Sequence, residues 1–90
     1  MGKWKGMIVW TLIENPCLRY GELKRMVMRT QKISDKVLIE TLKELESDGL
    51  VLRKDFKEIP PKVEYSLSKR GKELKPIFES MYTFGERYIV

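Results

Sequence analysis

The stretch 32–51 constrains this chain most, because it carries the start signal, the stop signal and the apolar stripe of one helix. Ser34 can accept hydrogen bonds from the free backbone N–H groups at a helix start, and acidic Asp35 follows it in the first turn. Gly49 suits the left-handed residue that ends a helix. Between these signals an apolar stripe repeats at helical spacing, formed by Leu38, Leu42 and Leu45. The sequence therefore predicts a helix over 34–48 with one buried face and one polar face.

Composition limits the class of protein. The 90 residues suffice for a single domain with a modest core, and we expect one domain over residues 1–90. Lys and Arg total 18 against 13 acidic residues, and the net charge of +5 favours negatively charged partners such as nucleic acid. No apolar run approaches the ~18 residues of a membrane span. The lone cysteine, Cys17, suits a reducing compartment, so we expect a soluble, cytoplasmic protein without a membrane partner.

Periodicity and turn signals around the central helix predict the remaining elements. Asn15 and Pro16 should break an N-terminal helix, and Pro60 and Pro61 should end the pairing of a hairpin. The expected elements are helices over 1–14 and 20–28, a short extended segment at 17–19, strands over 50–55 and 62–67, and a last helix over 69–90 capped by Ser68. The order is α-β-α-α-β-β-α. It predicts a mainly α fold with a small β-hairpin, an α+β winged helix-turn-helix domain.

The residue types present argue against an enzyme. The chain has no histidine and one cysteine, which excludes a His-dependent nucleophilic pair, a histidine zinc ligand and a clustered thiolate site. We therefore predict neither catalysis nor a metal or other cofactor. A winged helix can also serve as a protein-docking module without binding DNA, and this alternative stays open.

Five segments spread along the chain carry a family pattern. They are Gly2-Lys3-Trp4, Arg19-Tyr20-x-Glu22-Leu23, Ile33-Ser34, Leu42-Lys43-Glu44-Leu45-Glu46-x-Asp48-Gly49-Leu50-Val51-x-Arg53 and Pro60-Pro61-Lys62-Val63-Glu64-Tyr65-Ser66-Leu67, the last followed by Gly71 and Leu74. Together they resemble the HxlR-type bacterial transcriptional regulators over nearly the whole chain, from Gly2 to about Gly85. The resemblance implies a dimeric winged helix, related to the MarR group, that binds operator DNA.

Relatives in that family often sense oxidants through a cysteine beside a proline in an N-terminal segment. Cys17 lies elsewhere in this chain, so the resemblance implies no redox role for it. We expect Cys17 to be a small buried side chain. The sequence identifies neither a small-molecule nor a redox effector.

The start of the 34–48 helix and the turn before it should come nearest to base edges in a major groove. The candidate DNA-contacting residues there are Gln31, Lys32, Ser34, Lys36, Val37 and Glu40. Lys36 can donate to guanine, Glu40 can accept from cytosine N4, and Val37 can touch a thymine methyl group. The alternative for Lys36 and Glu40 is an exposed ion pair that contributes only ~0.2 to 0.5 kcal/mol.

Two further groups of basic residues are candidates for phosphate contact. The wing over 53–62 should lie beside the duplex backbone and carries Lys54, Lys57 and Lys62. The second group precedes the central helix and comprises Lys24, Arg25 and Arg29, for which a solvated helix face is nearly as good an explanation. Arg53 and Glu64 should pair across the two strands and play a structural role.

The C-terminal helix has more apolar surface than one small domain absorbs easily. The predicted dimer-interface residues are Trp4, Leu74, Ile77, Phe78, Met81, Tyr82, Phe84 and Tyr88. Packing of these side chains entirely within one monomer is the alternative. A two-fold homodimer would present two recognition helices to half-sites ~10 to 10.5 base pairs apart, or a multiple of that spacing, in a roughly palindromic operator.

Overall fold

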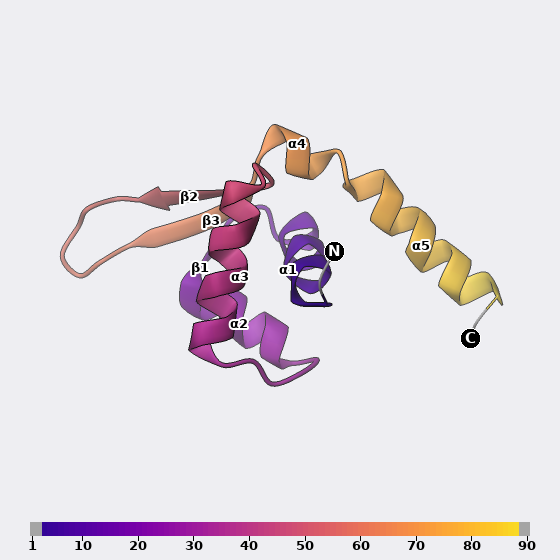
Figure 1. The fold of residues 1–90 in the computed structure, drawn as a ribbon, viewed down its shortest axis with the longest axis horizontal. Coiled ribbons are helices and arrows are strands. Elements are labelled where there is room, and N and C mark those ends of the chain that lie inside the picture. Colours follow the sequence, from indigo (N-terminus) through magenta and orange to yellow (C-terminus); the bar gives the residue numbers. More distant parts are fainter. Residues whose placement is uncertain (1–2, 89–90) are drawn as a thin grey trace.

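The computed structural model describes residues 3–88, with side chains described for residues 4–85. The elements are α1 Lys3–Glu14, β1 Leu18–Arg19, α2 Tyr20–Met28, α3 Asp35–Ser47, β2 Val51–Asp55, β3 Val63–Leu67, α4 Lys69–Lys72 and α5 Lys75–Tyr88. Figure 1 shows the β2–β3 hairpin projecting from one side of the helical body and α5 projecting from the other. The chain is mainly helical with a small antiparallel sheet, which confirms the predicted fold class. None of the helices within the described residues is long and apolar enough to cross a membrane.

One core joins α1, α2, α3 and the sheet. The apolar stripe predicted for α3 is almost completely buried, and α1 and the strands contribute the facing side chains. The buried apolar residues are Ile8, Val9, Leu12, Leu18, Leu23, Val27, Ile33, Leu38, Leu42, Leu45, Val51, Tyr65 and Leu67. Each fully buried Val, Leu or Ile side chain contributes ~1.5 to 3 kcal/mol. Because a whole face of α3 is held in this way, its opposite face is presented in a fixed orientation.

Both ends of α3 are closed as the sequence predicted. Ser34 has extended backbone geometry, and its hydroxyl accepts the backbone N–H of Val37 at 3.2 Å. At the other end Gly49 has a φ of 76°, a left-handed conformation that only glycine adopts without a Cβ penalty. The Leu50 N–H then donates to the Leu45 carbonyl at 3.0 Å, which closes the last turn. The helix therefore begins and ends at fixed points.

The hairpin belongs to a three-stranded antiparallel sheet in the order β1-β3-β2. β1, the predicted extended segment, pairs Leu18 with Tyr65 of the central strand. The β2–β3 ladder ends where Asp55 faces Val63, before the two prolines, as predicted.

The register corrects one expectation about this hairpin. Arg53 lies opposite Tyr65, and Lys54 lies opposite Glu64. Successive side chains of a strand point to opposite faces, so Arg53 and Glu64 lie on different faces of the sheet. The prediction that Arg53 pairs with Glu64 is wrong, because it assumed a register one residue away from the observed one.

The C-terminal helix is divided, whereas the sequence predicted one helix over 69–90. Ser68 caps α4 by accepting the Gly71 N–H at 3.0 Å, but α4 ends after a single turn at Lys72. Pro76 explains the division, because it has no N–H for the carbonyl of residue 72 and its ring would collide with that carbonyl in a continuous helix. In the first turn of α5 the same proline is tolerated.

Candidate nucleic-acid interface

The exposed face of α3 carries most of the residues predicted to contact bases. Ser34, Lys36 and Glu40 are exposed there, and Val37 is half-buried. Gln31 and Lys32 are also exposed in the preceding turn, which is anchored by buried Ile33. The structure therefore brings this predicted set together on one surface. Lys36 and Glu40 form no ion pair with each other in the described part of the chain, which leaves the alternative for these two side chains without support.

A polar cluster that the sequence did not predict holds the start of α3 against α2. The Tyr20 hydroxyl donates to Asp35 Oδ1 at 2.5 Å, and Lys24 Nζ donates to the same oxygen at 2.8 Å. The Lys24 ammonium and, to a lesser extent, the Tyr20 hydroxyl keep the pKa of Asp35 below its usual value. Burial, together with the Asp35 carboxylate, raises the pKa of Tyr20 to about 12. This cluster fixes the angle at which α3 leaves the turn.

The same contacts change the role expected of Lys24. The Lys24 ammonium forms an ion pair with the Asp35 carboxylate. Arg25 and Arg29 are exposed and lie four residues apart, on one face of the helical stretch. Arg29 lines a hollow with Trp10 and Glu14 of α1. The three residues predicted to contact the DNA backbone therefore do not form a single patch. Lys24 is paired with Asp35, whereas Arg25 and Arg29 are not.

In the wing, two of the predicted lysines converge on one aromatic ring. Lys54 Nζ lies 4.7 Å and Lys62 Nζ 4.3 Å from the centre of the Phe56 ring, distances typical of cation–π contacts. Lys62 also lies 3.8 Å from a carboxylate oxygen of Glu64, so its charge is partly offset. Ring and carboxylate restrict these long side chains and keep their ammonium groups beside the sheet.

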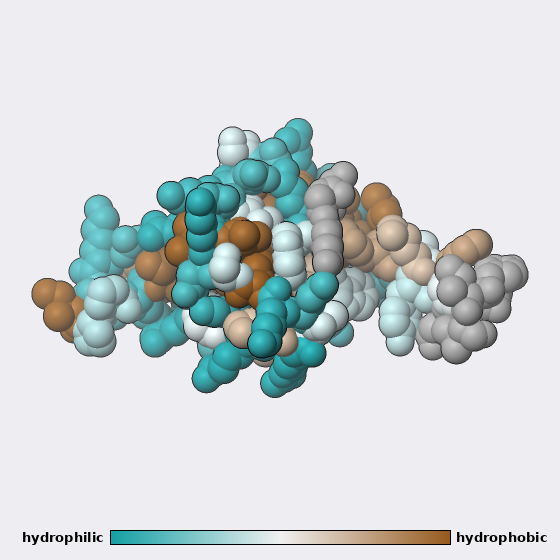
Figure 2. Space-filling view, turned by 60° about the horizontal axis from the view of Figure 1, so that its bottom comes forward, coloured by the Kyte–Doolittle hydropathy of each residue, from teal (hydrophilic) through white to brown (hydrophobic). Residues whose placement is uncertain are grey.

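Lys57 and Ile59 form the outer part of the hairpin. Lys57 is exposed in a left-handed conformation with a φ of 52°, which is stabilised because its N–H donates to the Asp55 carboxylate at 2.8 Å. Ile59 is 99% exposed, and Figure 2 shows hydrophobic colour at the outer end of the hairpin, next to hydrophilic residues. The wing therefore combines an exposed cation with an apolar tip.

The predicted dimer-interface residues divide into two groups. Ile77, Met81, Tyr82 and Phe84 are all more than half exposed, whereas Trp4, Leu74 and Phe78 pack partly against the core. Tyr88 lies outside the residues whose side chains the structure describes. α5 is thus an arm with a largely uncovered apolar side.

Trp10 of α1 joins this apolar side, a contact that the sequence did not predict. Its ring stacks on Tyr82 at a centroid distance of 6.2 Å and meets Phe78 at the same distance and an angle of 41°. Helical spacing could not reveal this, because the contact depends on the direction in which α5 leaves the body. Trp10 fixes α5 against α1 through two aromatic contacts.

Cys17 contradicts the expectation of a buried side chain. It is exposed, because the break after α1 leaves Pro16 and Cys17 at the surface before β1 begins. A hydrogen bond with Glu64, with some burial, raises the pKa of its thiol. The nucleophilic thiolate is therefore disfavoured. Elsewhere in the described residues, no group of three or more His, Cys, Asp or Glu side chains could hold a metal ion.

Comparisons with known proteins agree with this geometry. The uncharacterized HTH-type transcriptional regulator YkvN of Bacillus subtilis is 46% identical over 87 residues, which cover 97% of this chain and 70% of the relative. A solved structure assigned to the MarR family, from Porphyromonas gingivalis W83, superposes with a TM-score of 0.85 at 40% identity, covering 98% of this chain and 82% of that one. The redox regulator HypR in its reduced form gives a TM-score of 0.85 at 39% identity, covering 97% and 82%.

A family model described as HxlR-like helix-turn-helix matches residues 1–90. Relatives that align over almost the whole chain are named HTH-type transcriptional regulators, which is consistent with a DNA-binding regulator. The chain belongs to the HxlR-like helix-turn-helix family.

Proposed function

We propose that this protein is a homodimeric transcriptional regulator that inserts the 34–48 recognition helix into the major groove of a roughly palindromic operator. The observation that carries the proposal is the presentation of α3. One face of it is fully buried, its start is capped by Ser34 and held through Asp35, and Lys36 and Glu40 stand exposed beside that start. A helix fixed in this way can hold polar side chains at a defined angle to base edges.

The residues near the Ser34-capped start of α3 would contact the bases. Lys36 would donate to guanine O6 or N7, and Glu40 would accept from the cytosine amino group. Half-buried Val37 would offer a methyl group to thymine. Ser34 serves as a cap through its hydroxyl, and together with Gln31 and Lys32 it would contact bases or phosphates at the groove edge.

The 53–62 wing would lie on the flanking backbone. Lys57 is exposed near the outer end of the hairpin, and Lys54 and Lys62 are held beside Phe56. Phosphate contacts of this kind position a protein on the duplex without specifying sequence. Arg25 and Arg29 would extend the same contact from α2, whereas Lys24 would act mainly through Asp35.

A second copy of the chain would cover the apolar side of α5. Ile77, Met81 and Tyr82 are all more than half exposed, although Trp10 stacks on Tyr82, so one copy of the described chain leaves most of their surface uncovered. We place the dimer interface on residues 69–90 with help from α1 near Trp4 and Trp10. Two recognition helices would then meet half-sites ~10 to 10.5 base pairs apart, or a multiple of that distance.

Charge reversal tests the proposal directly. Duplexes are first selected from a random pool with the intact protein, and affinity is then measured by fluorescence anisotropy for Lys36→Glu, Lys57→Glu and a control, Lys69→Glu. Lys69 is equally exposed but lies on α4, near the opposite end of α3 from Ser34 (Figure 1). We expect a large loss for the first two variants and a small one for the control, with unchanged sedimentation as a dimer.

Salt dependence gives an independent measure of the footprint. If about six phosphates are neutralised per dimer, affinity should fall roughly a thousandfold between 50 and 200 mM salt. A dimer that forms no salt-sensitive duplex complex would contradict the proposal and favour a winged helix used for protein association. If Lys36→Glu bound the duplex as tightly as wild type, the proposal that α3 contacts DNA would be wrong.

A further inference from the structure

Ile59, at the outer end of the hairpin, is the most exposed large apolar side chain among the described residues. Its exposed fraction is 99%, whereas the other exposed large apolar side chains lie between 40% and 63%. Pro60 and Pro61 follow it and are exposed as well. In Figure 1 the hairpin extends away from the helical body, which therefore does not cover its tip. The wing ends in apolar surface that the fold leaves in water.

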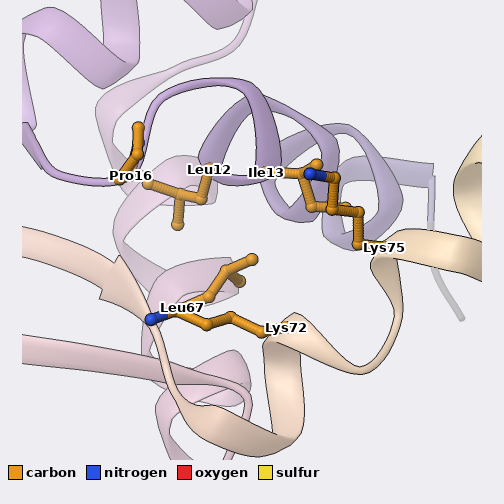
Figure 3. Close-up of a pocket in the computed structure, with 6 residues that line it drawn as sticks. All are labelled: Leu12, Ile13, Pro16, Leu67, Lys72 and Lys75. Atoms are coloured by element: carbon orange, nitrogen blue, oxygen red, sulfur yellow. The ribbon is translucent and has the colours of Figure 1, made fainter.

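Isolated apolar side chains are common on protein surfaces and usually need no explanation. Neighbouring lysines often border them, as in a hollow of about 260 Å³ between α1, β3 and the α4–α5 junction, where Lys72 and Lys75 share the lining with apolar residues (Figure 3). The stems of lysines can cover apolar surface while their charges stay in water. Ile59 has no such cover, because almost its whole surface is accessible. Its side chain therefore adds no burial to folding and is available to a partner.

The tip that carries Ile59 is held in shape before any partner binds. The Lys57 N–H donates to the Asp55 carboxylate at 2.8 Å, and the Phe56 N–H donates to the Lys62 carbonyl at 2.9 Å. The two prolines at 60–61 have a fixed φ. Because few backbone torsions remain free, binding through this tip would cost little ordering of the chain.

Charge alone would hold this wing weakly on DNA. Residues 54–62 carry three lysines against the two acids Asp55 and Glu58, a net charge of +1. The ammonium groups of Lys54 and Lys62 lie beside the Phe56 ring, at the base of the tip. Cations set back from an apolar end match a groove whose edges carry phosphates and whose floor offers the apolar faces of stacked bases.

The dimensions of the minor groove fit the tip and exclude the rest of the hairpin. Paired strands lie ~4.8 Å apart and their side chains add to that width, whereas the minor groove is about 6 Å wide. A recognition helix in the major groove leaves the adjacent minor groove to a flanking segment. Only the side chains beyond the last strand pair, Asp55 with Val63, could then enter it.

We propose that Ile59 and Pro60 form an apolar wedge that enters the minor groove beside each half-site and partly unstacks one base step. The proposal rests on the proposed function and adds a residue that determines specificity. Isoleucine and proline are among the side chains that proteins insert between base pairs from the minor groove.

Such a wedge would select sequence at positions where no side chain hydrogen-bonds to a base. Pyrimidine–purine steps such as TA unstack easily, whereas runs of adenine are stiff. The operator would therefore carry a flexible step on the outer side of each half-site. Lys36 and Glu40 of α3 would not influence this preference, because they contact other base pairs.

Duplex affinity tests the wedge. In a duplex selected with the intact protein, the flanks are replaced by adenine runs, and one TA step is moved through them position by position. We expect the wild type to bind roughly tenfold more tightly when the step reaches one position on each side. Ile59→Ser should reduce this preference to less than about twofold, and Ile59→Met, which keeps an apolar side chain, should retain most of it.

Leu52→Ser is the matched control. Leu52 is 55% exposed on the same hairpin but lies in the paired part, opposite Ser66. It should keep the wild-type preference. Because Ile59 contacts almost nothing in its own chain, Ile59→Ser should unfold in urea as the wild type does.

Unstacking is measured directly with 2-aminopurine in place of the adenine of the preferred step, because stacking quenches its fluorescence. Emission should rise on binding of the wild type and Ile59→Met, and not on binding of Ile59→Ser. A wild type without step preference, a preference that survives Ile59→Ser or is lost equally in Leu52→Ser, or unchanged emission would overturn the wedge. In each of these cases the wild type still binds duplex, so the proposed function stands and the apolar tip would face a protein instead. A wild type that binds no duplex would refute the proposed function and the wedge together.

Discussion

Gly71 marks the closest approach of α4 to the core, and replacing it by alanine is the most direct test of how the C-terminal arm is attached. A Cβ at this position would lie 2.2 Å from the Leu50 carbonyl oxygen and 3.1 Å from Cδ2 of Leu67. The leucine methyl group can shift. The carbonyl belongs to the backbone and accepts the Ser68 N–H at 3.0 Å, so α4 itself must move away.

The expected loss of stability follows from these contacts. Overpacking of a core costs about 1 to 3 kcal/mol, and weakening the Ser68 hydrogen bond adds about 1 kcal/mol. Alanine has a higher helix propensity than glycine, which offsets up to about 1 kcal/mol of this loss of stability. We therefore expect Gly71→Ala to lower the free energy of unfolding by about 2 kcal/mol, which for a chain of this size lowers Tm by roughly 10 °C.

Urea unfolding followed by circular dichroism measures this change, at one protein concentration because dimerisation would add to the apparent stability. Gly21→Ala is the matched control. Nothing lies within 4 Å of a Cβ at that exposed position of α2, so alanine should stabilise the protein by about 0.5 to 1 kcal/mol. If Gly71→Ala were as stable as wild type while Gly21→Ala gained stability, the inferred contact between α4 and Leu50 would be wrong.

Three other substitutions test the presentation of α3. Ser34→Ala removes the hydroxyl that accepts the Val37 N–H and should cost about 1 kcal/mol in urea unfolding, whereas Ser34→Asp should keep most of the stability; equal losses would argue against a capping role. Leu42→Ala should cost about 2 to 5 kcal/mol, because the side chain is 1% exposed, and a loss below 1 kcal/mol would contradict that burial. Asp35→Asn tests the contribution of the carboxylate whose pKa Lys24 and Tyr20 lower. That contribution is present above the unfolded pKa of ~3.9 and is lost as pH falls through the lower folded pKa, so Asp35→Asn should unfold with a flatter pH dependence in acid than wild type; identical profiles would show that the contact with Lys24 is not maintained in solution.

Local signals accounted for the central part of the fold. The hydroxyl at Ser34, the glycine at Gly49 and the leucine spacing between them each act over a few residues, and the structure places the ends of α3 where these signals stand. Strand alternation likewise located the hairpin, because Val63, Tyr65 and Leu67 lie on its inward side. Register was harder to predict. β2 begins with two apolar residues, Val51 and Leu52, so its sequence does not show which of its faces is inward, and the observed register places Lys54 rather than Arg53 opposite Glu64.

Features that depend on distant residues could not be predicted from the sequence. Tyr20, Lys24 and Asp35 meet because α2 and α3 pack against each other, and no spacing along the chain indicates that they share one oxygen. The contact of Trp10 with α5 is of the same kind. The division of the last helix is different. Pro76 disrupts a continuous helix through its missing N–H, but the sequence did not show that Gly71 of α4 packs against the Leu50 carbonyl, because that contact joins distant parts of the chain.

The short strand β1 has a mechanical consequence for the whole domain. Two residues, Leu18 and Arg19, hydrogen-bond to the central strand of the hairpin, and the next residue, Tyr20, both begins α2 and holds Asp35. Force applied at the hairpin therefore reaches the first turn of α3 through one tyrosine, with no flexible loop between them. Hairpin and helix should therefore tilt together as a single stiff frame, and in the proposed complex a curved duplex would act on both of them at once.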